Sequence, residues 1–313
     1  MLTYTARRLL TAIPTFIGVI TVVFIVMRLV PGDPAILILG ENVTAEALEA
    51  LREDLGLNEP LHVQYLEYIG NVIRGDFGTS LRTNRAVAGE VIRLFPYTAS
   101  LAVAGILIGS LIGISAGIIT ALRRNSATDY IVSAVATIGI AMPVFTLGII
   151  LLVIFSYNLG WFPAISTGRG GTLLETLRSL TLPAAALGIS VAAIITRMTR
   201  SSVLEILGQD FIRTAKAKGL SPRGITQNHV MKNALIPVVT IIGLNFGRLM
   251  SGTVITETLF VRPGLGRLLI DSIYARDYPQ VEVTVAFFAL SFIVINLLVD
   301  LTYAALDPRI QYS

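Results

Sequence analysis

Residues 210–237 read DFIRTAKAKGLSPRGITQNHVMKNALIP and separate two long apolar runs of the chain. The runs on either side have the length and composition of bilayer-spanning segments, whereas this stretch is polar and basic. We therefore expect it to lie in water between two membrane spans and to offer a surface to a separate protein. Its composition alone would also fit an ordinary charged loop.

The same stretch predicts two helices joined by a sharp turn. A short helix is expected over residues 203–218, followed by Gly219, because glycine tolerates the left-handed conformation that commonly ends a helix. Ser221 suits the N-cap of a second helix, and Pro222 suits its first position. Basic side chains near the end of the first helix are favoured by the helix dipole.

The composition indicates an integral membrane protein. Of the 313 residues, 54% are hydrophobic and only 14% are charged, whereas soluble domains average about 25% charged residues. No run alternates as the strands of a membrane barrel do, so we predict an all-α fold. Six runs are long enough to cross a bilayer, at residues 9–30, 97–122, 130–156, 180–198, 234–257 and 282–305.

Basic residues gather beyond alternate ends of these six runs. They are Arg7, Arg8, Arg123, Arg124, Arg200, Arg213, Lys216, Lys218, Arg223, Lys232 and Arg309. An even number of spans places all of them on one side of the membrane, and the positive-inside rule makes that side the cytoplasm. We expect both termini there, and we attribute the net charge of +4 to orientation and not to nucleic-acid binding.

Residues 31–96 form the largest loop on the opposite, outer side, and acidic residues outnumber basic ones within it. Helical periodicity starts at Thr44 and again after Pro60, with stops at Gly56 and at the GDFG sequence of residues 75–78. We expect a small helical cap, which could close over the mouth of a pathway or dock a delivery protein. A rigid plug packed on the outer face is the alternative.

Glycine and proline shape two of the predicted spans. In the third span, Pro143 predicts a kink. In the second span, glycine recurs every fourth residue and gives one helix face a smooth stripe that lets another helix approach closely. These residues are Gly105, Gly109, Gly113 and Gly117.

The fifth span carries a charge within the bilayer. With Ala234 as the inner boundary, Arg248 lies about 20 Å into the bilayer at 1.5 Å per residue. A guanidinium is costly there unless it is paired or faces water. One hypothesis is that Arg248 and Asn245, one turn earlier, line a pathway, where a peptide carboxylate would suit the arginine. Pairing with Glu257 or an acid of a neighbouring subunit, or extension toward the outer surface, are the alternatives.

The sequence lacks the patterns that most enzymatic sites need. No GxxxxGK[ST] stretch occurs, so no ATP site is expected in this chain. The absence of cysteine excludes disulfides and thiolate metal sites, and His62 and His229 are far apart in sequence. The acidic residues cluster at span ends, so a proton-coupled carrier also lacks support. A channel or a pathway driven by a partner's energy remains.

Several long strings along the chain resemble one family. They are RLVPGDP (28–34), LGLNEPLHVQYLEYI (55–69), GDFGTS (75–80), TRMTRSSVLEILGQDFIRTAKAKGL (196–220), NALIPVVT (233–240), PGLGRLLIDSIYARDYP (263–279) and NLLVDLTYAALDPRI (296–310). Together they are similar to the inner-membrane permeases of bacterial ABC importers of the dipeptide/oligopeptide/nickel group. Within this group the chain looks most similar to dipeptide and glutathione permeases.

The resemblance implies a role for the polar stretch in coupling to an ATPase. In this family the loop between the fourth and fifth spans carries the EAA motif and docks in a groove of the ATPase subunit. The motif maps onto Arg213, Thr214, Ala215 and Gly219, with Arg213 and Thr214 where glutamate and alanine are usual. The implied coupling site, within a cytoplasmic loop over residues 200–233, comprises Arg213, Thr214, Ala215, Lys216, Ala217, Lys218, Gly219, Leu220, Ser221 and Pro222.

The resemblance also implies partners and a mechanism. Residues 1–313 would form one transmembrane domain in the bacterial cytoplasmic membrane and share a pathway with a second, homologous permease subunit. Two ABC ATPase subunits would bind ATP and Mg²⁺, so the chain itself is expected to be no enzyme and to hold no cofactor. An outer solute-binding protein would deliver a di- or oligopeptide, which alternating access would carry inward. Glutathione, haem or nickel are alternative cargoes, and a stand-alone ion-coupled carrier is an alternative of another class.

Overall fold

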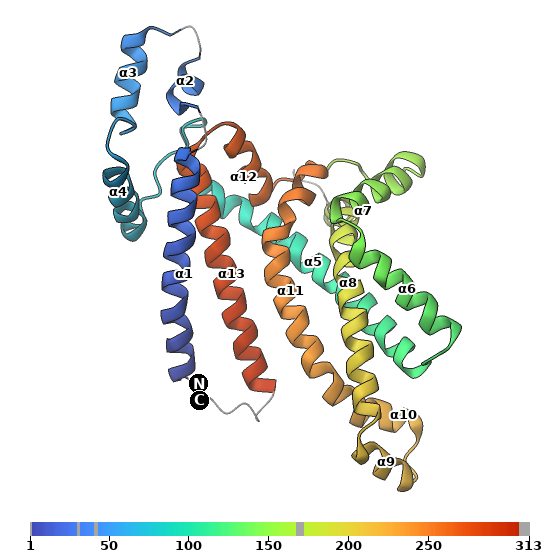
Figure 1. The fold of residues 1–313 in the computed structure, drawn as a ribbon. Coiled ribbons are helices and arrows are strands. Elements are labelled where there is room, and N and C mark those ends of the chain that lie inside the picture. The colour runs from blue at the N-terminus through green and yellow to red at the C-terminus, as the bar shows by residue number, and fades with distance from the viewer. Residues whose placement is uncertain (1, 30–31, 41–42, 167–171, 307–313) are drawn as a thin grey trace. The chain divides into compact units, whose positions relative to one another are not determined.

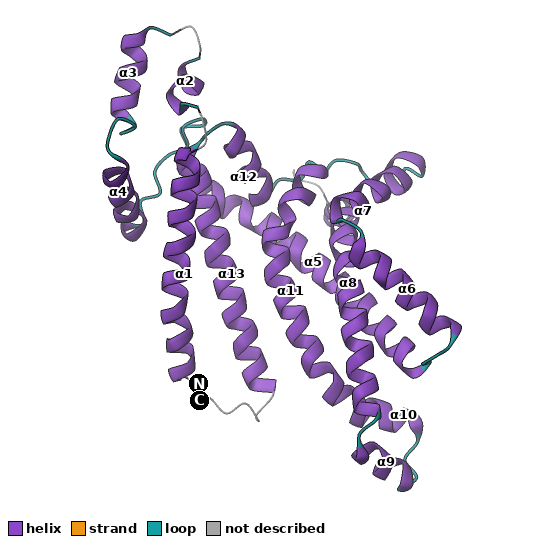
Figure 2. Ribbon diagram, in the orientation of Figure 1, coloured by secondary structure: helices purple, strands orange, loops and turns teal. Residues whose placement is uncertain are grey.

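The computed structural model describes residues 2–29, 32–40, 43–166 and 172–306. Within these ranges the chain is built of helices and connecting loops, with a single isolated β-bridge between Thr79 and Ala86. Figure 1 shows the order of the helices, and Figure 2 shows how little of the described chain lies outside them. The all-α prediction is therefore confirmed.

Two compact units divide the chain. The first comprises Met1–Tyr97 and Pro263–Ile293, and the second comprises Thr98–Arg262 and Val294–Ser313. The helices α5 (Val87–Leu122) and α13 (Tyr278–Leu306) each contribute to both units.

The first unit is held together by Arg28 near the end of its first helix. Its helices are α1 (Leu2–Leu29), α2 (Pro34–Leu39), α3 (Ala45–Asp54), α4 (Leu61–Arg74), α12 (Leu265–Tyr274) and the first parts of α5 and α13. Arg28 Nε donates to Gln64 Oε1 of α4 at 2.9 Å, and Arg28 Nη1 donates to Glu282 Oε1 of α13 at 2.5 Å. The guanidinium carbon lies 3.4 Å from the centre of the Phe24 ring. One side chain thus links α1, α4 and α13.

Asp277, directly before α13, ties a further segment into the first unit. It is 2% exposed, and its carboxylate accepts hydrogen bonds from Ser80 Oγ at 2.5 Å and from Leu81 N at 3.1 Å. The same carboxylate accepts from Gln280 N at 3.3 Å, in the first turn of α13. The strings GDFGTS and YARDYP, which are far apart in sequence, therefore meet at one buried carboxylate.

The two helices predicted for the cap are confirmed, and a third accompanies them. Thr44 caps α3 through its side chain, and α4 begins after Pro60 and ends at Gly75, whose φ is +75°. The short α2 was not predicted, although Asp33 is its side-chain N-cap. α5 begins at Val87, inside the range of residues 31–96 that was predicted for the cap.

The second unit is organised around α8. Its helices are α6 (Ala127–Ala141), α7 (Val144–Leu151), the π-helix η1 (Leu152–Asn158), α8 (Leu173–Leu207), α9 (Asp210–Ala217), α10 (Pro222–Ile225), the π-helix η2 (Thr226–Val230), α11 (Met231–Leu259) and the remainder of α5 and α13. α8 packs against α6, α7 and α11. Of its most apolar stretch, 61% is buried, against 17–33% for the other long apolar helices.

The predicted layout of six spans holds only if one of them is broken. Among the described residues, five helices are long and apolar enough to cross a membrane, and the pair formed by α6 and α7–η1 would make a sixth. The expected kink at Pro143 is instead a bend of 108°. Proline disfavours the helical conformation of the residue before it, and Met142 is extended, with φ −81° and ψ 124°.

Two of the spans are also longer than predicted. α5 starts at Val87 and not at residue 97, and α8 starts at Leu173 and not at residue 180. Hydropathy identifies only the apolar part of a helix, so it does not detect polar residues that extend the helix beyond that part. Pro96 and Pro183 lie inside these helices without ending them.

The glycine stripe of α5 is a close contact with α8, as predicted. A Cβ atom built on Gly113 would lie 2.6 Å from Ile195 Cβ and 2.8 Å from Ala192 O. One built on Gly117 would lie 2.5 Å from Thr199 Cβ. The two helices approach so closely that a methyl group at either glycine would displace α8.

Gly113→Ala should therefore destabilise the protein, because the added methyl group must push Ile195 and the α8 backbone aside. Overpacking of this kind costs about 1–3 kcal/mol, which would lower the thermal-unfolding midpoint of the detergent-solubilised protein. Gly89→Ala, on the same helix, is the matched control, since nothing lies within 4 Å of its added Cβ. Equal midpoints for the two variants would contradict the close α5–α8 contact.

Candidate functional site

Residues 208–230, hereafter the interhelical segment, join α8 to α11 and contain the predicted coupling residues. α8 ends at Leu207, and Gln209, with φ −73° and ψ 150°, turns the chain into α9. The single helix expected over residues 203–218 is therefore wrong. The extended Gln209 interrupts it, and Asp210 begins a new helix in a first turn that favours an acidic residue.

A Schellman turn ends α9 at Gly219, which confirms the sharp turn predicted there. Leu220 N donates to Ala215 O at 3.3 Å, and Gly219 N donates to Lys216 O at 3.0 Å; these two hydrogen bonds define the motif. Gly219 has φ +77°, and nothing lies within 4 Å of a Cβ built on it. The glycine is thus required by the left-handed backbone conformation and not by lack of space.

The start of α10 also follows the prediction. Ser221 is the N-cap, its Oγ accepts from Gly224 N at 3.2 Å, and Pro222 occupies the first helical position. The helix then continues through η2 into α11, so that Pro222–Met250 forms one candidate span. α10 is therefore continuous with the membrane-spanning part of α11.

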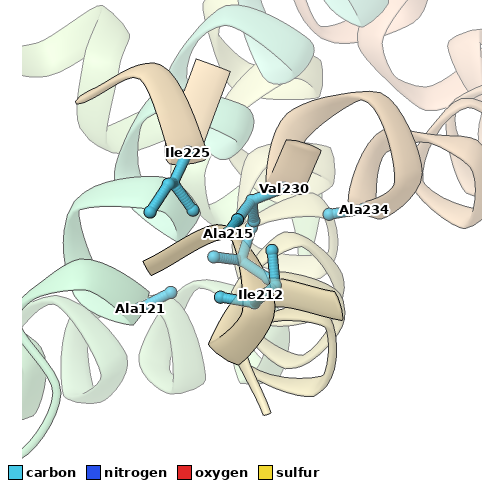
Figure 3. Close-up of a cluster of buried hydrophobic side chains, with 7 residues drawn as sticks. Ala121, Ile212, Ala215, Ile225, Val230 and Ala234 are labelled. Carbon is cyan, nitrogen blue, oxygen red and sulfur yellow. The ribbon is translucent and has the colours of Figure 1, made fainter. Parts of the chain in front are cut away.

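A hydrophobic cluster holds the interhelical segment on the second unit. Ile212 and Ala215 of α9 are 0% and 7% exposed. The buried members of the cluster are Ala121, Val203, Ile212, Ala215, Ile225, Val230 and Ala234, which come from α5, α8, α9, α10, η2 and α11 (Figure 3). An isolated helix as short as α9, with 8 residues, is unstable in water. Burial in this cluster is what stabilises it.

The opposite face of the interhelical segment is exposed and basic. Of the ten predicted coupling residues, Ala215 is buried in the cluster, and nine are exposed: Arg213, Thr214, Lys216, Ala217, Lys218, Gly219, Leu220, Ser221 and Pro222. Phe211 and Leu220 add apolar surface, with 44% and 46% exposure. Exposed apolar side chains bordered by lysine and arginine suit a surface that binds an acidic site on another protein.

Two polar contacts that sequence analysis missed anchor the helices behind this segment. Ser202 Oγ of α8 donates to Ala234 O of α11 at 2.9 Å. Arg200 of α8 donates from Nε and Nη2 to the two carboxylate oxygens of Asp129 in α6, at 2.7 and 2.8 Å. The Asp129 side chain is 3% exposed, so this bidentate pair fixes α6 to α8. Opposite charges near two span ends were the available signal, but they do not identify which residues pair.

The two candidate pathway residues lie on α11, away from the interhelical segment. Asn245 is 5% exposed and donates from Nδ2 to Ile241 O of its own helix at 2.8 Å. Arg248 is exposed and makes no hydrogen bond or ion pair with any residue that the structure describes. The alternative pairing with Glu257 is therefore not found. Glu257 is 0% exposed and accepts from Thr98 Oγ1 at 2.6 Å.

No cluster of metal ligands stands out in the described ranges, where no group of three or more His, Cys, Asp or Glu residues could hold an ion. His62 belongs to α4 of the first unit and His229 to η2 of the second.

The chain matches models of one family along nearly its whole length. Residues 109–312 match the binding-protein-dependent transport system inner membrane component, and residues 1–102 match the N-terminal part of such membrane components. Two similar proteins are the glutathione transport system permease proteins GsiC of Salmonella choleraesuis (strain SC-B67) and Escherichia coli (strain K12). They are 43% and 42% identical over 313 residues, with 100% of both chains covered in each comparison.

Solved structures share the fold at lower identity. The MetNI methionine ABC transporter, in an inward-facing conformation, aligns with a TM-score of 0.59 and 18% identity, covering 69% of this chain and 96% of that chain. An amino acid ABC transporter with histidines aligns with a TM-score of 0.54 and 16% identity, covering 70% of this chain and 94% of that chain. With the full-length relatives, these likenesses agree on one conclusion. The chain belongs to the inner membrane components of binding-protein-dependent transport systems and is a multi-pass permease subunit of an ABC importer.

Proposed function

We propose that this permease subunit imports small peptides or glutathione, with energy that separate ATPase subunits supply through the interhelical segment. The observation that carries the proposal is the two-faced character of that segment. Its inner face is buried in the hydrophobic cluster, whereas nine of its ten predicted coupling residues are exposed. Because the interhelical segment is anchored by its buried face and exposes a basic surface, another protein could bind it and move it.

In this proposal the interhelical segment acts as a lever. Two ATPase subunits bind ATP and Mg²⁺, draw together and displace α9 and α10. Because α10 continues into α11 through η2, the displacement passes directly into a membrane span. The spans of this chain and of a second, homologous permease subunit then open alternately to the two sides of the membrane. The chain itself carries out no catalysis and holds no cofactor.

The orientation of the chain follows from where such a lever must work. ATP is available in the cytoplasm, so the interhelical segment and both termini lie there, as the positive-inside rule also favours. The helices α2, α3 and α4 then lie on the outer side, where a solute-binding protein delivers the cargo. The many exposed side chains of α3 and α4, which have no buried residues, suit a docking surface of this kind.

The cargo is inferred from the relatives and from the strings shared with dipeptide permeases. The GsiC proteins are named as glutathione permeases, and glutathione is itself a small peptide with free carboxylates. A single pathway chemistry would therefore serve both classes. Haem and nickel are the other cargoes that the wider group suggests.

The test is purification of the chain from its native membrane in mild detergent, followed by reconstitution into proteoliposomes. A P-loop ATPase and a second permease should copurify, and uptake of labelled glutathione or of a dipeptide should require ATP and the solute-binding protein. Competition among glutathione, dipeptide, haem and nickel identifies the cargo. Uptake that continues without ATP and collapses with an ion gradient would instead establish a stand-alone carrier.

Gly219→Pro should uncouple ATP hydrolysis from uptake while the complex still assembles. Proline cannot adopt a φ of +77° and lacks the N–H that donates to Lys216 O, and such strain costs about 1–3 kcal/mol at the turn. Gly219→Asn is the control, because asparagine tolerates the left-handed conformation. ATPase activity and uptake are measured on the same proteoliposomes. Substrate-dependent uptake at the wild-type rate in the proline variant would exclude the lever.

A further inference from the structure

Three arginines in or next to spanning helices have hydrogen-bond or ion-pair partners within the chain. Arg28 and Arg200 form the ion pairs described above. Arg262, three residues after the end of α11, is 3% exposed and donates to Ser166 Oγ at 2.9 Å and to Ser100 Oγ at 3.2 Å. Each of these three arginines therefore has an acceptor within its own unit, in keeping with the cost of burying an unpaired charge.

Arg248 of α11 differs from these three. It is exposed and has no hydrogen-bond or ion-pair partner among the residues that the structure describes. It shares its helix face with Leu244, four residues earlier, and Ile255, seven residues later, which are 42% and 58% exposed. A guanidinium on a membrane span needs an acceptor. That acceptor must come from outside the described chain.

We propose that Arg248 binds a carboxylate of the transported molecule. The inference rests on the proposed import of glutathione or small peptides, all of which carry at least one free carboxylate. A guanidinium offers a planar pair of donors that matches a carboxylate, and arginine lines pores that select anions. Asn245, the other candidate pathway residue, is only 5% exposed and donates to Ile241 O of its own helix, so the geometry assigns the role to Arg248.

Arg248 lies on the helix that continues from the interhelical segment. Arg248 lies eleven residues before Leu259, the last residue of α11, which is about 16 Å along the helix axis. In the other direction, α11 continues without interruption back through η2 to α10. The residue that would contact the cargo and the segment that would receive the force of ATP binding therefore belong to one continuous helical path.

The complete transporter, with its solute-binding protein and ATPase subunits, provides the test in proteoliposomes. ATP-driven uptake of glutathione, dialanine and dialanine amide is compared for the wild type, Arg248→Gln and Arg248→Lys. Arg197→Gln is the matched control, because Arg197 is an exposed arginine on α8. Copurification of the second permease and basal ATPase activity are measured for every variant.

We expect Arg248→Gln to lower kcat for glutathione and dialanine by about tenfold, the worth of one charge-assisted hydrogen bond. Because the solute-binding protein determines KM, KM should not change. Arg248→Lys should keep most of the rate, and the rate for the amide, which lacks the carboxylate, should not differ between the wild type and Arg248→Gln. Arg197→Gln should transport all three probes as the wild type does.

Four results would overturn the inference. One is Arg248→Gln uptake of dialanine within about twofold of the wild type, less than loss of a charge-assisted hydrogen bond would cause. The second is an equal loss for dialanine and its amide. The third is loss of the second permease on purification, which would assign Arg248 to a subunit contact. The fourth is a defect that varies with the anionic lipid content of the vesicles, which would assign it to a headgroup.

A different result would contradict the proposed function itself. If the wild-type complex shows no ATP-driven uptake of any of these probes, the proposed cargo class is wrong and the inference falls with it. If the wild type transports them and Arg248→Gln does so equally well, the proposed function stands and only the inference is overturned.

Discussion

The burial of Ile212 and Ala215 against the ends of α5, α8 and α11 is the contact on which coupling would depend. α9 has 8 residues and is too short to remain helical in water without it. The Schellman turn at Gly219 then fixes the direction in which the chain leaves α9, and the Ser221 cap starts α10 without a flexible join. Because each of these features is local and rigid, a force on the exposed face would move α10 and α11 and would not be lost in bending of the loop.

The charged residues fall into two groups: those that pair with other residues of this chain, and those that are exposed and available to other molecules. Arg28, Arg200 and Asp277 are committed to partners in their own unit, where they join helices that are distant in sequence. The lysines of the interhelical segment are exposed, and so is Arg248 on α11, the span that follows this segment. A subunit that links a cytoplasmic partner to a cargo needs exposed charge both on its interhelical segment and along the span that follows it.

The sequence predicted those features that arise from local chemistry. The turn at Gly219, the Ser221 cap, the cap helices and the glycine stripe each depend on residue type at a known position in a helix or turn, and all four are present. The resemblance to importer permeases was also correct.

Other features depend on tertiary geometry or on conformations that propensity leaves open. Pro143 predicted a kink, but the bend of 108° also needs Met142 to be extended, which composition does not determine. The break at Gln209 was missed although Gly208, the C-cap of α8, directly precedes it. The Asp129–Arg200 pair was missed because their positions in sequence do not show that α6 and α8 meet side by side. Within the candidate site, Ala215 is buried whereas the other nine predicted coupling residues are exposed. This difference depends on tertiary packing, which the sequence does not show.

The docking of an ATPase on the interhelical segment can be tested directly because the chain has no cysteine. Ala217→Cys, on the exposed face of α9, is labelled with benzophenone maleimide in the complete transporter and irradiated. Thr176→Cys, which is exposed near the opposite end of α8, serves as the control. A cross-link to the ATPase subunit from position 217 and none from position 176 is the predicted result. A position-217 variant that yields no ATPase adduct, and that is labelled by an impermeant maleimide from outside intact cells, would contradict both the docking surface and its orientation.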